Sequence, residues 1–175
     1  MKKLLLVVDY QNDFVSGSLG FPGAEKLAGP IAAKIGAYRA AGDDVAFTMD
    51  THDEGYMDTQ EGHKLPVPHC LGGSEGWQLY GEVAAAARGD DNAFSKPTFP
   101  SLELAGWLKK QKYGSVELCG LVSYICVISN AVMVKAALPE AEILVDAHCT
   151  AGPDERLNAE ALDLLECIHV TVTNR

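Results

Sequence analysis

Short apolar runs alternate with longer helical stretches along this chain, and that alternation restricts the folds available to it. The runs predicted to be strands are 4–8, 45–49, 93–95, 116–121, 143–145 and 168–173. The stretches predicted to be helical are 24–41, 101–112, 123–138 and 153–166. Strands that alternate with helices form a parallel sheet with helices packed on both faces. We therefore expect an α/β fold in a single domain spanning residues 1–175.

The net charge, the hydrophobic pattern and the cysteine content limit the binding partners and the cellular compartment that we expect for this protein. The formal net charge of −10 disfavours nucleic acids and anionic membrane surfaces, because both repel an acidic protein. No apolar stretch approaches the roughly 20 residues that a membrane-spanning helix needs. The amino terminus resembles a signal peptide, but Asp9 interrupts it without a small-residue cleavage site, so a buried first strand is predicted. Five irregularly spaced cysteines are typical of reduced thiols and predict a cytoplasmic protein.

Cys126 lies where the chain turns from a predicted strand into a predicted helix. The unpaired N–H groups and the positive dipole end of a first helical turn favour the thiolate, which is the nucleophilic form of cysteine. A buried structural cysteine is the alternative interpretation. Asp9, Asp50 and Lys96 also follow predicted strands. Because ligands bind beyond the carboxyl ends of the strands in an open parallel sheet, we expect these four residues to form a site.

Asp9 and Lys96 can supply the proton transfer and charge that such a nucleophile requires. A carboxylate at the end of a strand can take a proton from a thiol and later pass it to a leaving group. The charge of Lys96 would keep Asp9 ionised and favour the thiolate of Cys126. Taken singly, a turn aspartate and a surface lysine are the ordinary alternatives. The tight turn that contains Gly120 and Val122 adds N–H groups that can hold an oxyanion, although a simple packing glycine is the alternative there.

A second polar group begins after the second strand. Asp50 and His52 are two residues apart in an extended segment, so their side chains point the same way and can share one ion. The connection 51–81 is too long for a plain loop, and its His, Gly, Pro and acidic residues indicate a function. It contains His69, whose approach is stiffened by prolines. Mixed histidine and carboxylate ligands with open positions suit a divalent ion such as Zn²⁺, Fe or Mn, and solvated loop charges are the alternative.

In combination, motifs spread over nearly the whole chain resemble the isochorismatase-like cysteine hydrolases, and among them the nicotinamidase branch. The motifs are Asp9-Tyr10-Gln11-Asn12-Asp13-Phe14, Asp50-x-His52, Pro68-His69-Cys70 followed by Gly73 and Gly76, Lys96, and Gly120 with Cys126-Val127. The resemblance implies a doubly wound sheet of about six parallel strands with helices on both faces, and a homo-oligomer. True isochorismatases lack the cysteine nucleophile, so Cys126 argues against vinyl-ether hydrolysis.

The resemblance also implies roles for individual residues. Asp9, Lys96 and Cys126 would form a catalytic triad. A cis peptide between Leu121 and Val122 would direct the N–H of Val122, with that of Cys126, toward an oxyanion. The implied metal ligands are Asp50, His52, Glu61 and His69, and His63 is the alternative to Glu61. Phe14 would line the substrate pocket, and Tyr124 could add aromatic surface to it.

The residues, together with the resemblance, predict hydrolysis of a small carboxamide through a thioester on Cys126, and the resemblance implies nicotinamide as the substrate. A divalent metal, with zinc expected, would orient the substrate, and no nucleotide cofactor is needed. One alternative is a metal-independent hydrolase of the same family that acts on another amide or ureido compound. Two non-enzyme alternatives are a partner-binding domain and a redox sensor in which Cys126 pairs with Cys119 or Cys149.

Overall fold

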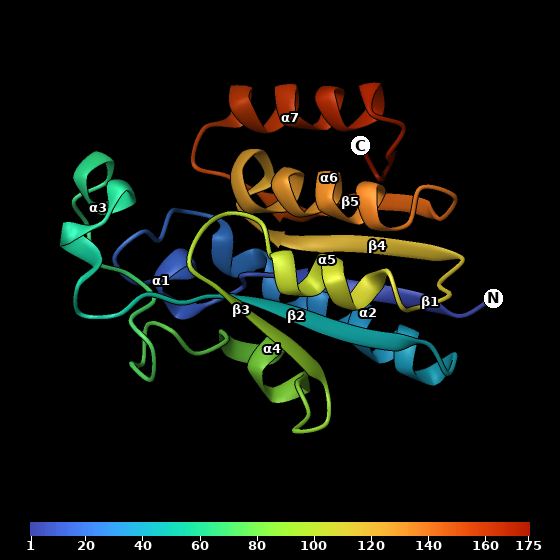
Figure 1. Ribbon diagram of the computed structural model, residues 1–175, viewed down its shortest axis with the longest axis horizontal. Coiled ribbons are helices and arrows are strands. Elements are labelled where there is room, and N and C mark those ends of the chain that lie inside the picture. Colours follow the sequence, from blue (N-terminus) through green and yellow to red (C-terminus); the bar gives the residue numbers. More distant parts are fainter.

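A six-stranded, all-parallel sheet organises the computed structural model, which describes residues 1–175 (Figure 1). The strands lie in the order β3-β2-β1-β4-β5-β6, so the chain begins in the middle of the sheet and winds outward twice. This is the doubly wound arrangement predicted from the sequence, and its switch point lies between β1 and β4. The strands are β1 (Lys3–Val8), β2 (Asp44–Asp50), β3 (Asn92–Lys96), β4 (Ser115–Leu121), β5 (Glu142–Ala151) and β6 (Thr171–Thr173).

The central strand β1 is apolar on both faces because helices cover the sheet on both sides. Leu4 and Leu6 point into one hydrophobic cluster, whereas Leu5 and Val7 point into the other. This is the period-2 alternation of a β-strand with both faces buried. The carboxyl end of β1 is therefore held rigidly at the centre of the molecule.

Helices α5 (Leu102–Leu108), α6 (Ile128–Ala137) and α7 (Glu155–Cys167) cover one face, and α2 (Ala28–Ala40) and α4 (Gly81–Ala86) cover the other (Figure 1). The side chains of Ser101 and Asp154 begin α5 and α7 by accepting the N–H groups of Leu104 and Leu157. The remaining helical elements are α1 (Asn12–Val15), α3 (Gln60–Lys64), the 3₁₀ turns η1 (Ala24–Leu27) and η2 (Tyr56–Asp58), and the π-helical turn η3 (Ser123–Val127).

The last two strands differ in length from the prediction. Strand β5 continues far beyond 143–145, because the polar Asp146 that interrupts its apolar pattern is buried against Lys34, with 2.7 Å between Oδ2 and Nζ. Strand β6 begins only at Thr171. Ile168 and Val170 pack on the core from a turn, so their hydrophobicity indicated burial and not strand structure.

The long connection 51–81 contains only η2 and α3 as regular structure. Isolated bridges join His52 to Leu71 within it and Leu79 to Gln11. The connection therefore folds back over the carboxyl ends of β1 and β2, where the candidate site lies. No helix in the structure combines the length and the apolar character needed to cross a membrane.

Candidate active site

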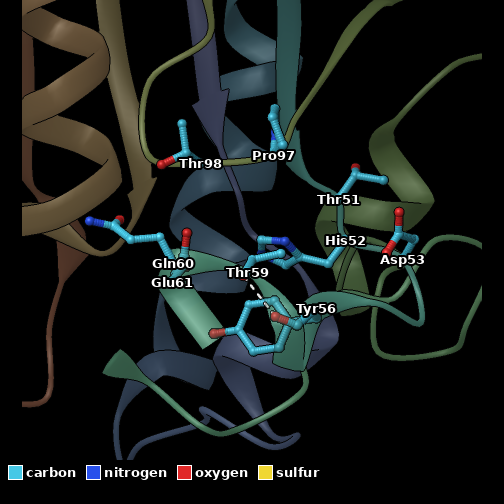
Figure 2. Close-up of a pocket in the computed structure, with 9 residues that line it drawn as sticks. All are labelled: Thr51, His52, Asp53, Tyr56, Thr59, Gln60, Glu61, Pro97 and Thr98. Carbon is cyan, nitrogen blue, oxygen red and sulfur yellow. Dashed lines mark hydrogen bonds between the residues drawn. The ribbon is translucent and has the colours of Figure 1, made fainter. Parts of the chain in front are cut away.

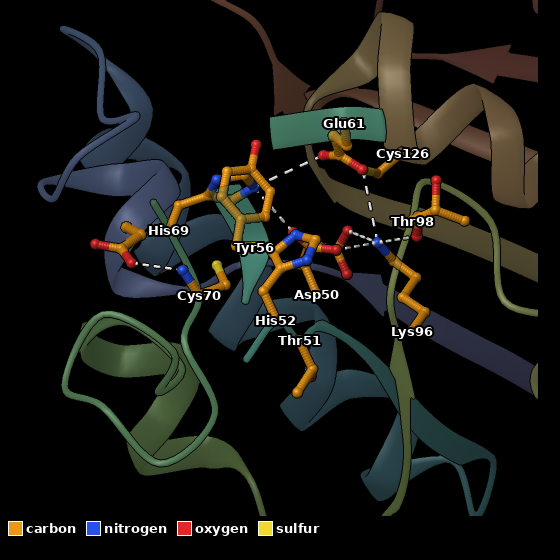
Figure 3. A network of polar contacts seen from close by, with 12 residues as sticks. Asp50, Thr51, His52, Tyr56, Glu61, His69, Cys70, Lys96, Thr98 and Cys126 are labelled. Atoms are coloured by element: carbon orange, nitrogen blue, oxygen red, sulfur yellow. Dashed lines mark hydrogen bonds and ion pairs between the residues drawn. The ribbon is translucent and has the colours of Figure 1, made fainter. Parts of the chain in front are cut away.

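Four adjacent strands deliver polar side chains to one edge of the sheet (Figure 3). Asp9 follows β1, Asp50 ends β2, Lys96 ends β3, and Cys126 lies in the turn η3 after β4. Because these strands are neighbours and run parallel, their carboxyl ends meet at the switch point. The structure thus brings together the four residues that the sequence placed at strand ends.

Lys96 lies at the centre of this group. Its Nζ is 2.6 Å from Oδ2 of Asp9, 3.2 Å from Oδ1 of Asp50 and 3.7 Å from Sγ of Cys126, and it donates to the carbonyl of Thr98 at 3.0 Å. The side chain is only 1% exposed. Burial alone would lower the pKa of Lys96, but the negative charges around it outweigh burial and raise the pKa. Lys96 is therefore a buried cation shared by three acidic groups.

Asp9 is fully buried in a left-handed backbone conformation with φ of 45°. Its Oδ1 accepts a hydrogen bond of 2.7 Å from the hydroxyl of Thr48 on β2. Burial raises the pKa of Asp9, and Lys96 opposes that shift. A carboxylate whose pKa is raised by burial, and which lies beside a thiol, is suited to accept the proton of that thiol.

Cys126 is 6% exposed, and its surroundings differ from the expectation drawn from a helix end. Burial raises the pKa of the thiol well above its ordinary value, Asp9 and Asp50 raise the pKa further, and Lys96 only partly opposes them. Burial therefore opposes formation of the thiolate, and a base that takes the proton would promote the nucleophilic form.

The turn between β4 and Cys126 has an unusual backbone. Gly120 has φ of 113°, and a Cβ at this position would overlap the carbonyl oxygen of Val8. The peptide bond between Leu121 and Val122 is cis, as the family resemblance implies. The carbonyl of Val122 accepts the N–H groups of Ile125 and Val127 at 3.0 and 3.1 Å, while its own N–H donates to no backbone carbonyl. That N–H is available beside the thiol.

Asp50, His52 and His69 form a compact buried cluster whose ligand atoms all lie within 4.8 Å of one another. Both Nε2 atoms approach the same carboxylate oxygen of Asp50, at 3.1 Å for His52 and 3.3 Å for His69 (Figure 3). Nδ1 of His69 lies 2.8 Å from the carbonyl of Val67, an acceptor that requires this nitrogen to carry a hydrogen, so Nε2 is the atom that a neutral His69 would offer to a metal. Two imidazoles that converge on one carboxylate fit a divalent cation such as zinc.

The fourth predicted ligand is not part of this cluster. Oε1 of Glu61 lies 3.9 Å from Nε2 of His69, outside the group in which all ligand atoms converge. His63, the alternative to Glu61, is exposed on α3 and lies away from the cluster. Of the two alternatives, Glu61 is therefore the one that approaches a residue of the cluster.

An apolar cavity of about 220 Å³ opens onto Cys126 and the histidine cluster. Phe14 lines it, as predicted, whereas Tyr124 lies outside the lining. Tyr124 packs against Gly152, and its hydroxyl accepts the N–H of Asp154 at 3.4 Å. The cavity is lined by Phe14, Leu19, Asp50, Glu61, Leu65, His69, Phe99, Val122, Ile125, Cys126 and Pro153.

A second cavity, of about 280 Å³, lies against His52 and is lined mostly by polar residues (Figure 2). Tyr56 is its single hydrophobic residue. Glu61 lines both this polar cavity and the apolar one, whereas His52 faces only the polar cavity and His69 only the apolar one. The ligand cluster is thus bordered by two cavities of opposite character.

Several supporting residues were not identified from the sequence. Thr48 binds Asp9, and Gln11 binds the backbone of Asp50. Asn130 is fully buried and donates to the carbonyls of Cys126 and Phe99 at 2.8 and 3.1 Å. Its position four residues after Cys126 on a helix was the one available signal, because residues at that spacing share a face.

Comparison with known proteins agrees with this arrangement. The family model described as the isochorismatase domain matches residues 3–175. This chain belongs to the isochorismatase family. A relative named PncA from Bacillus subtilis strain 168 is 31% identical over 144 residues, which cover 75% of this isochorismatase-family chain and 78% of the relative.

Two solved structures show how closely the fold of this family member is shared. The crystal structure of nicotinamidase/pyrazinamidase PncA from Bacillus subtilis is 28% identical, with a TM-score of 0.86 over 98% of this chain and 99% of that one. The pyrazinamidase of Pyrococcus horikoshii in complex with zinc is 22% identical, with a TM-score of 0.86 over the whole of both chains. At 22% identity, the second comparison shows a shared fold and nothing more.

Proposed function

We propose that this protein hydrolyses small carboxamides, with nicotinamide as the substrate, through a thioester on Cys126. The observation that carries the proposal is the buried group of Asp9, Lys96 and Cys126 at the end of an apolar cavity. Cys126 at the nucleophile position, and a structural relative named nicotinamidase/pyrazinamidase, support amide chemistry over vinyl-ether chemistry.

The proposed reaction begins with proton transfer from the thiol of Cys126 to Asp9, after which the sulfur attacks the amide carbon. The N–H groups of Val122 and Cys126 hold the developing oxyanion. Asp9 returns the proton to the departing nitrogen, and ammonia leaves. Asp9 then takes a proton from water, whose oxygen cleaves the thioester and releases the carboxylic acid and the thiol. Throughout these steps Lys96 balances the negative charge.

We propose that Asp50, His52 and His69, with Glu61 beside them, hold a divalent metal, and that this metal is zinc. When bound, such an ion supplies a Lewis-acid contact that fixes a ring nitrogen of the substrate. With Nδ1 facing the carbonyl of Val67, Nε2 is the atom that His69 would offer to the ion. Burial alone would raise the pKa of Asp50, but hydrogen bonds with both histidines and the charge of Lys96 outweigh it and lower the pKa, so Asp50 is an anionic ligand.

The character of the apolar cavity supports a substrate that consists of a small, uncharged ring with a carboxamide group. Its polar members gather at the end that contains Asp50, His69 and Cys126, and the remaining walls are aromatic or aliphatic. The one cation beside the cavity, Lys96, is already paired with two carboxylates. A neutral carboxamide such as nicotinamide therefore fits this environment better than an amide that carries its own carboxylate.

The deciding experiment is ammonia release from nicotinamide, and from a panel of other carboxamides and ureido compounds, with and without a chelator. Release that the chelator suppresses and that Cys126→Ala lowers by more than about 1,000-fold would support the whole proposal. Turnover that resists the chelator would remove the metal and support the metal-independent alternative. Unchanged activity in folded Cys126→Ala would overturn the nucleophile assignment.

We further propose that the protein works as a homo-oligomer in a reducing compartment such as the cytoplasm. All five cysteines are free thiols in the structure, which supports the compartment. Size-exclusion chromatography with light scattering would test the oligomer, and a monomer at micromolar concentration would contradict it.

A further inference from the structure

The side chain of Gln11 is completely buried, and its amide forms hydrogen bonds with the backbone of Asp50. Its Oε1 accepts the N–H of Asp50 at 2.8 Å, and its Nε2 donates to the carbonyl of Asp50 at 2.9 Å. Nε2 also donates to the carbonyl of Trp77 at 2.8 Å. Both N–H groups and the oxygen of the amide are therefore engaged, and the two contacts to Asp50 bracket its Cα.

These contacts take the place of the backbone hydrogen bonds that β1 would make to Asp50 if the pairing of β1 with β2 continued. The pairing of β1 with β2 ends at Val8 and Thr48, because the left-handed conformation of Asp9 turns the chain away. On its other side β2 remains paired with β3 as far as Asp50 and Lys96. The peptide groups of Asp50 on the β1 side would be buried without partners if the Gln11 amide did not bond to them.

Asp50 is the residue whose orientation connects the two halves of the site. Its Oδ1 is paired with Lys96, and its Oδ2 faces both His52 and His69. A rotation about the Asp50 backbone would move both oxygens at once. The backbone on each side of its Cα must therefore be held firmly for one carboxylate to serve the lysine and the histidine cluster together.

We propose that Gln11 is a positioning residue that sets metal affinity by holding the Asp50 carboxylate in its ligating orientation; this inference rests on the proposed metal site. Gln11 does not itself line the apolar cavity, and its side chain hydrogen-bonds only to the backbone of Asp50 and Trp77. It acts on the cluster through the backbone of one ligand. Partners that orient metal ligands typically change affinity by about 10–100-fold when they are removed.

The test compares Gln11→Met, Gln11→Glu and Asn12→Ala with the unsubstituted protein. Methionine has a similar length without polar atoms, whereas glutamate keeps the shape and loses the amide donors. Asn12 is the matched control, because its side chain donates only to the carbonyl of Glu75 and touches no residue of the site. Each metal-free protein is titrated with Zn²⁺ against a chromophoric chelator, and thermal unfolding establishes that each variant is folded.

We expect the Kd for Zn²⁺ to rise about 10–100-fold in Gln11→Met, and kcat to recover when zinc is added in excess. Asn12→Ala should bind zinc like the unsubstituted protein. Unchanged zinc affinity in folded Gln11→Met would overturn the role of Gln11 alone, and Gln11→Glu decides by the same criterion if the methionine variant does not fold. Absence of zinc binding by the unsubstituted protein would overturn the metal site and, with it, this role.

Discussion

Lys96 is the residue on which the electrostatics of the site depend. It is the one cation among Asp9, Asp50 and the thiol of Cys126, and none of these groups is open to bulk water. Charges in such surroundings interact far more strongly than charges at a surface. Loss of one partner is costly because the others are then left buried and uncompensated.

Lys96→Met should therefore lower both activity and stability. We expect a loss of about 3–5 kcal/mol in the free energy of unfolding, measured with urea, because two buried carboxylates lose their counter-charge. Ammonia release should fall by more than about 100-fold. Lys112→Met, at an exposed position, is the control and should change neither quantity. A Lys96→Met protein with full stability would show that the ion pairs contribute nothing net.

Phe99 offers a residue-scale test of substrate binding. It lines the apolar cavity and is 43% exposed, so part of its ring is free to contact a bound substrate. Phe99→Ala should raise KM for an aromatic carboxamide by about tenfold, because apolar contact area is lost, and should leave kcat nearly unchanged. Steady-state kinetics separate the two constants. A fall in kcat with constant KM would place Phe99 in the chemical step instead.

Residues at strand ends could be placed together from the sequence, whereas the positions of Glu61 on α3 and Tyr124 in η3 could not. Asp9, Lys96 and Cys126 each follow a recognisable apolar run, so sheet topology alone brings them together. The orientation of the Tyr124 side chain depends on the π-helical turn η3, and no local sequence pattern predicts such a turn. The raised pKa of the Cys126 thiol comes from burial by segments distant in sequence, which no local pattern shows.

The strand-to-helix turn after β4 is the element most constrained by its backbone. Gly120 lies against the carbonyl of Val8 on the neighbouring strand, with a positive φ that side chains disfavour. The apolar run before this turn was readable from the sequence, as was the helix after it. The crossing of two backbones at Gly120 was not, because it depends on strands that are distant in sequence.

Gly120→Ala should destabilise the protein by more than about 3 kcal/mol, because the added methyl group meets backbone that cannot move aside. Gly36→Ala is the matched control. Gly36 lies inside α2, where a Cβ would meet nothing within 4 Å, so helix propensity predicts a gain of about 1 kcal/mol. Chemical denaturation of both variants measures these opposite changes. Equal stability of the two would contradict the close approach of β1 and β4.

At the scale of the molecule, an ion-pair group ties α2 to the sheet on the face away from α6. Nζ of Lys34 is 2.6 Å from Glu117 on β4 and 2.7 Å from Asp146 on β5. Burial alone would raise the pKa of Asp146, but hydrogen bonds, foremost that from Lys34, outweigh it and hold the pKa below its ordinary value. This group joins the two halves of the doubly wound sheet.

Lys34→Met should destabilise the fold in a pH-dependent way. The lowered pKa of Asp146 contributes stability above about pH 4, and that contribution disappears as pH falls through the folded-state pKa. Without Lys34 we expect a loss of about 3 kcal/mol at pH 7 and a smaller loss once the pH falls below the folded-state pKa of Asp146. Urea unfolding at several pH values measures the difference between variant and unsubstituted protein. A loss that is constant with pH would contradict this origin.

The two cavities that meet at Glu61 give the ligand cluster one face toward the substrate and another toward solvent (Figure 2). An ion held there would exchange through the polar cavity while an amide fills the apolar one. Substrate should consequently close the path of an alkylating reagent to the Cys126 thiol and leave a chelator's path to the metal open. Alkylation and chelation would then be separate routes to inactivation, through two different cavities.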